Sequence, residues 1–146
     1  MLDQFKLKGY VTLLKFDRTG RCVEETRIEN LIVDKGLEYT AKLLNGVSSD
    51  AFKYIAIGTN NTAVTTSDTT LTTEEDRVLA TAVYEASFKA KLTGTFNFTG
   101  NVTIREAGIF DDASVGNILS HVTFADKSFA AGESLAMIWT IEFARS

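Results

Sequence analysis

The residue types that most often carry chemistry are sparse in this chain. His121 is the single histidine of the 146 residues, and one histidine does not build a multi-histidine metal site. A serine–histidine–aspartate triad would need His121 beside a serine and an aspartate, and nothing in the sequence brings such residues together. We therefore interpret His121 as a structural or surface residue and predict that the protein is not an enzyme.

Acidic clusters are the next candidates for chemistry. The run Glu74-Glu75-Asp76 and the pair Asp111-Asp112 offer oxygen ligands for Ca²⁺, but both lack the alternating Asp/Asn and Gly pattern of a calcium loop. Paired carboxylates hydrolyse glycosides when they face each other across a cleft, and the sequence leaves Glu74 or Glu106 open to such a pair. We predict no catalytic residue, no metal and no cofactor.

Glu106 carries a more specific expectation. It alternates with Ile104, Gly108 and Phe110, a pattern that turns its carboxylate toward the apolar side of a strand. A buried charge without a partner is costly, so Glu106 needs a basic or hydrogen-bonding neighbour. We predict a structural ion pair of Glu106 with Arg77, and Arg105 is the alternative partner.

Composition excludes several classes of protein. The net charge of −4 and the pI near 5.0 argue against a nucleic-acid coat, which needs a basic stripe. No apolar run resembles a signal peptide or approaches the roughly 20 residues of a membrane span. The single cysteine, Cys22, has no intramolecular disulfide partner, and we expect it to be a small buried apolar residue.

The elements that position these residues are mainly strands. Strand formers from Phe5 to Phe16 meet a turn at residues 17–20, and the chain returns through Arg21 to Ile28 as a hairpin. Apolar residues at helical spacing predict one short helix at about residues 35–45, with Asp34 as its cap and Asn45-Gly46 as its end.

Strict alternation of apolar and polar residues marks the rest of the sheet. It runs from Val78 to Leu92 with Phe88 on the apolar face, and again along the last strand, where Trp139 faces the core. The polar stretch from Thr59 to Thr73 predicts a long loop. We predict a single domain, residues 1–146, with a mainly β fold: an antiparallel two-sheet β-sandwich with one short α-helix.

The order of several sequence blocks resembles a widespread group of small bacteriophage virion structural proteins. The blocks span nearly the whole chain: Asn30-Leu31-Ile32-Val33 with Gly36-Leu37, Ala56-Ile57-Gly58-Thr59, Ser67-Asp68-Thr69 with Leu71, Glu74 and Arg77, Glu106 to Phe110, and Trp139 to Phe143. The resemblance implies a protein made in the bacterial host cytoplasm and incorporated into the virion. It implies a homo-oligomer, with three-fold symmetry the expected arrangement, whose partners are other virion proteins and neither nucleic acid nor membrane.

Within this group we favour a capsid decoration, or cement, protein that binds and stabilises the assembled shell. The compact chain has no shaft, coiled coil or receptor-binding extension. A tail, baseplate or tail-fibre-associated protein is the alternative, and the partner is then a tail or baseplate protein rather than the major capsid protein. The candidate interface comprises Phe5, Leu7, Thr59, Asn60, Asn61, Thr62 and Phe129.

A carbohydrate-binding module is the second alternative, because β-sandwiches commonly carry glycan sites. Such sites need exposed aromatic platforms. Trp139 has the alternation of a core residue, which weakens this interpretation. A buried Trp139 and scattered Tyr10 and Tyr54 would count against a glycan site, whereas two or three aromatic rings coplanar in a groove would favour one.

Overall fold

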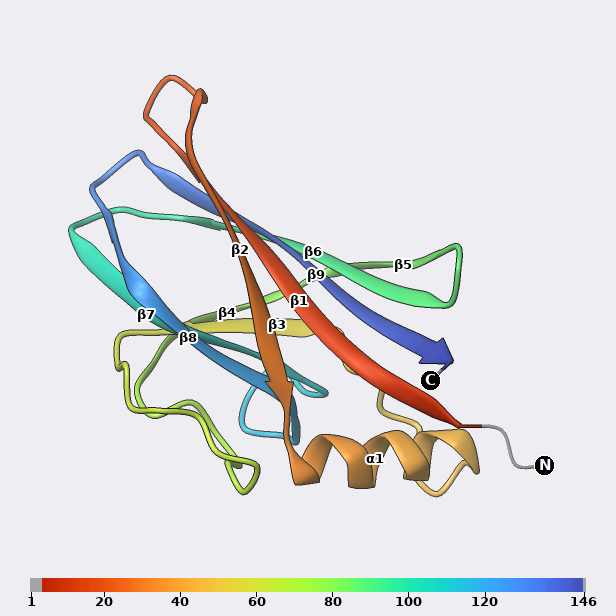
Figure 1. The fold of residues 1–146 in the computed structure, drawn as a ribbon. Helices are drawn as coiled ribbons and strands as arrows, with labels where there is room; N and C mark the ends of the chain where they lie inside the picture. The colour runs from red at the N-terminus through yellow and green to blue at the C-terminus, as the bar shows by residue number, and fades with distance from the viewer. Residues whose placement is uncertain (1–3, 146) are drawn as a thin grey trace.

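The described part of the chain forms a single antiparallel β-sheet with one helix (Figure 1). The computed structural model describes residues 4–145, and residues 1–3 and 146 lie outside the described part. The elements are β1 (Phe5–Phe16), β2 (Cys22–Ile32), α1 (Asp34–Leu44), β3 (Tyr54–Gly58), β4 (Glu74–Leu79), β5 (Thr81–Glu85), β6 (Lys89–Asn97), β7 (Val102–Phe110), β8 (Ile118–Phe129) and β9 (Ser134–Arg145). The predicted mainly β fold with one short helix is confirmed.

The predicted two-sheet sandwich is not clearly what the chain forms. All nine strands belong to one sheet in the order β4-β3-β7-β8-β2-β1-β9-β6-β5. Its two edge strands, β4 and β5, follow each other in the chain with only the buried Ala80 between them. β4 pairs with β3, and β5 pairs with β6. The segment from residue 74 to residue 85 therefore links both edges, and the sheet is nearly closed into a barrel.

The opening hairpin forms as the sequence predicts. β1 and β2 pair antiparallel, and the side chain of Asp17 accepts hydrogen bonds from the backbone N–H groups of Thr19 and Arg21. Gly20 has a φ of +84°, the left-handed conformation that glycine adopts without a steric penalty. Cys22, expected to be buried, is exposed at the start of β2, where the hairpin reaches past the neighbouring strands (Figure 1).

The helix α1 lies where its apolar spacing predicts, and it ends at the predicted Asn45-Gly46 pair. Asn45 is the C-cap, and Gly46 follows with a φ of +79°. Asp34 does not cap the helix, because the N-cap residue is Val33 and no side chain fills that role. Instead the backbone N–H of Asp34 donates to the carbonyl of Thr66, 2.8 Å away. The polar loop between β3 and β4 therefore contacts the start of α1.

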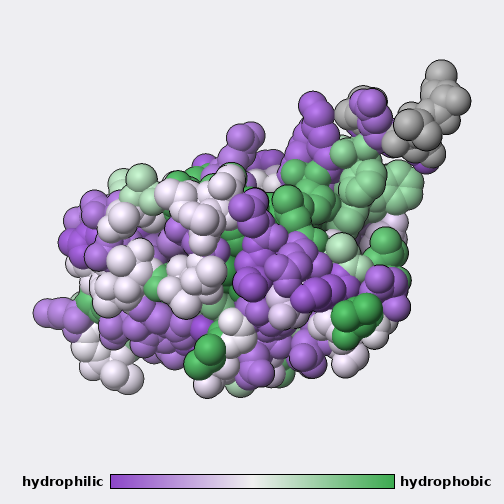
Figure 2. Space-filling view, turned by 90° about the horizontal axis from the view of Figure 1, so that it is seen from below, coloured by the Kyte–Doolittle hydropathy of each residue, from purple (hydrophilic) through white to green (hydrophobic). Residues whose placement is uncertain are grey.

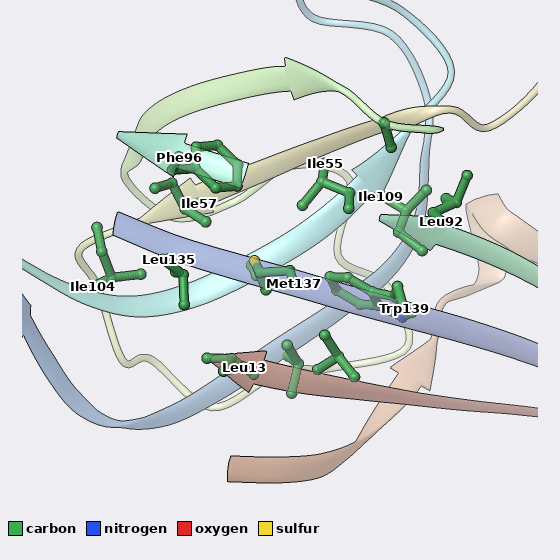
Figure 3. Close-up of a cluster of buried hydrophobic side chains, with 14 of the residues drawn as sticks. Leu13, Ile55, Ile57, Leu92, Phe96, Ile104, Ile109, Leu135, Met137 and Trp139 are labelled. Atoms are coloured by element: carbon green, nitrogen blue, oxygen red, sulfur yellow. The ribbon is translucent and has the colours of Figure 1, made fainter. Parts of the chain in front are cut away.

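The main hydrophobic core lies inside the curved sheet (Figure 3). Alternate residues of β9 point into it, as predicted, and Trp139 is fully buried. Val11 and Leu13 of β1 are paired with Trp139 and Met137, so the neighbouring strands present their apolar side chains to the same interior. Burial of each large side chain stabilises the fold by roughly 1.5–3 kcal/mol.

Two aromatic residues have the opposite exposure to solvent from the one predicted. Phe88, predicted to face the core, is 57% exposed, because the chain reverses between β5 and β6 and the alternation restarts there. Phe88 itself has a φ of +64° at this reversal. Phe129, predicted as an interface residue, is buried at the end of β8 and stacks on Phe98 with 4.4 Å between ring centroids.

Candidate functional site

The polar loop from residue 59 to residue 73, here called the anchored loop, covers the outer face of β3, β7 and β8. One face of β7 carries Ala107 and Ile109 into the main core. Its other face carries Glu106 and Phe110 toward the loop, where Leu71 completes a second, smaller apolar cluster: Val33, Ala56, Leu71, Phe110 and Ile118. The loop is therefore packed onto the sheet by a small core of its own.

Glu106 is fully buried beneath the anchored loop and accepts hydrogen bonds mainly from loop backbone groups. Its Oε1 accepts from the N–H of Thr72 at 2.8 Å, and its Oε2 accepts from the N–H groups of Thr73 at 2.8 Å and Asn60 at 3.2 Å. The fourth contact joins Oε1 to Nε2 of His121 at 2.9 Å. A buried carboxylate satisfied in this way holds both ends of the loop at one point.

The predicted ion pair of Glu106 with Arg77 is wrong, and so is the alternative with Arg105. Arg77 pairs with Glu74 at 2.6 Å and lies over the ring of Phe110. Arg105 pairs with Asp126 at 2.8 Å and donates to the carbonyl of Thr59 at 3.0 Å. Backbone N–H groups of the anchored loop donate hydrogen bonds to the buried carboxylate. The types of residue in a loop do not indicate which backbone groups will donate.

His121 extends the buried polar chain from the sheet to the middle of the anchored loop. Its Nδ1 lies 2.8 Å from Oδ2 of Asp68, and its exposed fraction is 2%. Asp68 also accepts from the backbone N–H and the hydroxyl of Thr65. Burial raises the pKa of Asp68, but the hydrogen bonds from Thr65 and His121 outweigh that effect and hold its pKa below the ordinary value.

The chain of Asp68, His121 and Glu106 links β7 and β8 to the anchored loop. Each ring nitrogen of His121 already faces a carboxylate oxygen, so neither is free to accept a proton from a nucleophile. Among residues 4–145, no three His, Cys, Asp or Glu side chains are placed to hold a metal ion.

The acidic turn after β7 is likewise occupied by protein donors. The carboxylate of Asp111 accepts from the backbone and side-chain nitrogens of Asn117 at 2.7 Å and 2.9 Å. Arg77 donates to the carbonyls of Asp112 and Val115 and so braces the same turn. Both interactions stabilise the end of the sheet beside the anchored loop.

The outer surface of the anchored loop presents polar side chains in one defined shape. Asn60 accepts from the backbone and hydroxyl of Thr62 through its own side chain, which forms a small turn. Asn61 and Thr62 are exposed, whereas Thr59 is half-buried and bonded through its backbone to Thr73. Of the predicted interface residues, Thr59 to Thr62 therefore lie together on this loop, apart from Phe5 and Leu7.

A second candidate surface lies where α1 passes the ends of β1 and β9, here called the open end. A groove of about 1490 Å³ between helix and sheet is lined by Phe5, Leu7, Leu37, Leu44 and Phe143 among others. An adjoining pocket of about 460 Å³ shares Leu7, Leu43 and Phe143 and continues to Ala82, Val83 and Tyr84 of β5. Figure 2 shows hydrophobic surface gathered beside the N-terminal end of the chain.

Comparisons of this chain with known protein families, curated proteins and solved structures found no match. No helix within residues 4–145 has the length and apolar character needed to cross a membrane.

The tryptophan and two tyrosines considered for a glycan site do not gather on one exposed face. Trp139 is fully buried, and Tyr10 and Tyr54 are half-buried on different strands. Tyr10 is covered by the guanidinium of Arg27, 3.9 Å from the ring centroid. These positions count against a carbohydrate-binding module. The rings of Phe5 and Phe143, in contrast, both line the groove at the open end and stack with 6.2 Å between centroids, so the opposite criterion is met in part.

Sequence reasoning found the loop and the buried acid separately but missed the link between them. The available signal was the coincidence of one buried-parity glutamate, one histidine and one aspartate in a threonine-rich loop. Only the fold shows that Gly108 of β7 pairs with His121 of β8, a register that brings the histidine alongside Glu106.

Proposed function

We propose that this protein is a bacteriophage virion structural protein, specifically a capsid decoration protein that binds and stabilises the assembled shell. The resemblance of its ordered sequence blocks to small virion proteins supports the virion assignment. The observation that carries a binding role is the anchored loop, an irregular polar segment held in one shape by a buried carboxylate and histidine. Long irregular loops in compact domains are commonly functional surfaces mounted on a rigid sheet.

The anchored loop supplies the contact with the shell under this proposal. Because Glu106 and Asp68 already hold the loop, binding does not have to order it, and less free energy is lost on association. Many copies that bind only the assembled lattice stabilise it by mass action. Weak individual contacts then add through multivalency.

A tail or baseplate position remains the alternative within the same class. No feature of the anchored loop favours a tail protein over a shell protein as its partner. The distinction comes from locating the protein on the particle, and the experiment below separates the two positions.

The first test locates the protein in intact particles. Particles of the phage that encodes this chain are purified on a density gradient, and the protein is quantified by mass spectrometry and placed by electron cryo-microscopy. The decoration proposal expects many ordered copies on the head surface with the anchored loop facing the shell. Density confined to the tail supports the alternative, and absence from purified particles rejects a virion role.

A second test examines the loop itself with purified protein added to particles that lack it. Asn61→Arg places a bulky cation on the exposed loop, and Asn101→Arg makes the same change in the exposed turn between β6 and β7. We expect Asn61→Arg to weaken co-sedimentation with particles at least tenfold and Asn101→Arg to leave it unchanged. Equal binding by both variants would exclude the anchored loop as the contact surface.

A further inference from the structure

The two edges of the sheet are protected to different degrees. The edge strand β4 begins with the charged residues Glu74, Glu75, Asp76 and Arg77, and charged edges discourage pairing with another strand. The other edge strand, β5, reads Thr-Ala-Val-Tyr-Glu from Thr81 to Glu85 and carries no charge before its last residue. Its side chains are exposed or half-exposed, and it pairs with β6 on one side only. The β5 edge is therefore open to a further strand.

The sequence of β5 is complementary to itself in an antiparallel arrangement. If two β5 strands pair with Val83 opposite Val83, the small Ala82 of each strand lies opposite the large Tyr84 of the other. Thr81 then lies opposite Glu85, and the two glutamates stand at opposite ends of the pairing. No like charges face each other directly, which avoids the main penalty for strand pairing.

The exposed apolar surface at this end matches what a dimer requires. Within residues 4–145, the large apolar side chains exposed there are Phe5, Leu37, Leu44, Val83, Tyr84, Phe88 and Phe143. At roughly 150–250 Å² for each aromatic side chain, they expose on the order of 700 Å² together. Each partner in a standard interface contributes roughly 800 Å², and a monomer rarely leaves such a patch in water.

The open edge and the apolar surface are continuous. Val83 and Tyr84 line the same pocket as Leu43 of α1 and Phe143 of β9. Ala82 and Tyr84 are paired with Leu92 and Ala90 of β6, so they belong to the sheet face that continues into the core. A strand added at β5 would extend this face across the open end.

We propose that a second copy of this chain pairs with the β5 edge about a two-fold axis at Val83 and covers the open end. The interface is isologous: the same strand and the same apolar patch are used by both copies. This contact differs from the three-fold arrangement expected from the resemblance, and it leaves the anchored loop free on both copies. It does not depend on whether the protein binds a shell.

Opposite charges at the two-fold position provide the test. Val83→Lys and Val83→Glu each place like charges face to face in a homodimer, and a mixture of the two variants places opposite charges there. We expect the wild-type chain to be a dimer in sedimentation equilibrium and each variant alone to dimerise at least tenfold more weakly. The mixture of Val83→Lys and Val83→Glu should recover dimers that contain one copy of each.

Matched controls separate this effect from damage to the strand. Val23 on β2 is 51% exposed, as is Val83, so Val23→Lys makes the same change elsewhere. Lys91 of β6 pairs with Val83 within one copy, so lysine at position 83 meets a like charge there, whereas glutamate meets an opposite one. Loss of the dimer in both variants therefore reports the contact between copies.

Several results would overturn the proposal. A wild-type chain that stays monomeric at high concentration, or forms a trimer, excludes the two-fold contact. A dimer that Val83→Lys and Val23→Lys affect equally places the interface elsewhere. Failure of the mixed variants to associate, with both correctly folded by circular dichroism, excludes the pairing of Val83 with Val83.

Discussion

Glu106 shows how a single buried charge organises a surface of this protein. Its carboxylate receives three loop N–H groups and one histidine nitrogen, so it replaces the water that these donors would otherwise need. The sequence indicated that Glu106 needs a partner, and that expectation is met. The identity of the partner was not predictable, because backbone donors from residues 60, 72 and 73 look alike in any loop.

Replacement of Glu106 by alanine should destabilise the fold strongly. The change leaves three N–H groups and His121 without their acceptor in a buried place, and loss of one partner from a buried charged network costs about 3–5 kcal/mol. The free energy of unfolding, measured with urea, tests this. Glu75→Ala removes an exposed carboxylate from β4 and should change the value by less than about 0.5 kcal/mol. A cost for Glu106→Ala as small as that of the control would mean that the network does not hold the loop.

Asp68 should make the stability of the protein depend on acidity. Its pKa in the folded state lies below the ordinary value of 3.8, so the fold favours the ionised carboxylate. The resulting stabilisation is present above the unfolded-state pKa and is lost as the pH falls through the folded-state pKa.

Comparison with Asp68→Asn isolates this contribution. The wild type should exceed the variant in unfolding free energy at neutral pH, and the difference should shrink as the pH drops below 3.8. Urea unfolding of both proteins across this range is the measurement. A difference that grows on acidification would contradict the assignment.

At the scale of elements, alternation and turn chemistry were reliable where strands are long and one-sided. The β1–β2 hairpin, α1 and β9 lie where the residues predict them. The strand boundaries between residue 74 and residue 97 could not be predicted in the same way. One continuous alternation of apolar and polar residues runs through β4 and β5, which meet at Ala80, and through the chain reversal before β6. The side chains of Ala82 and Tyr84 lie on the predicted face of the sheet. This part of the face extends beyond the core, so both side chains are exposed.

Gly58 at the end of β3 allows the anchored loop to approach the sheet. A Cβ atom at this position would lie 2.6 Å from Cγ of Glu106 and would also meet the carbonyl oxygen of Thr73. Gly58→Ala should therefore lift the loop and cost about 1–3 kcal/mol. Limited proteolysis should then cleave within residues 59–73 faster than in the wild type. Gly100→Ala, where a Cβ meets nothing within 4 Å, is the control and should leave both stability and cleavage unchanged.

At the scale of the whole molecule, the nearly closed sheet joins strands that are distant in sequence into one core. Val78 of β4 lies 3.1 Å from the position that a Cβ on Gly94 of β6 would occupy, so the edge strand β4 contacts the strand next to the opposite edge. The sequence predicted strands and their apolar faces but not the closure, because closure depends on the corner at Ala80. Alternation in β4 and β5 is the same whether the strands belong to two sheets or to one curved sheet.

Trp139 offers a direct measurement of this shared core. It is the single tryptophan and is fully buried, so its fluorescence should lie to the blue in the folded protein and shift to the red on unfolding. If the core is continuous, this shift and the loss of far-ultraviolet circular dichroism should coincide in one urea transition. Two separate transitions would indicate that the halves of the sheet unfold independently.

The pairing of the first and last strands has a mechanical consequence. Phe5 lies opposite Arg145 at one end of an antiparallel pair, so force applied to these two residues separates β1 from β9 at that end. The hydrogen bonds between the strands then break one after another, as in a zipper, rather than all together under shear. Stretching by the chain ends should therefore open this protein at low force. A force directed along the strands would instead load many of the inter-strand hydrogen bonds at once.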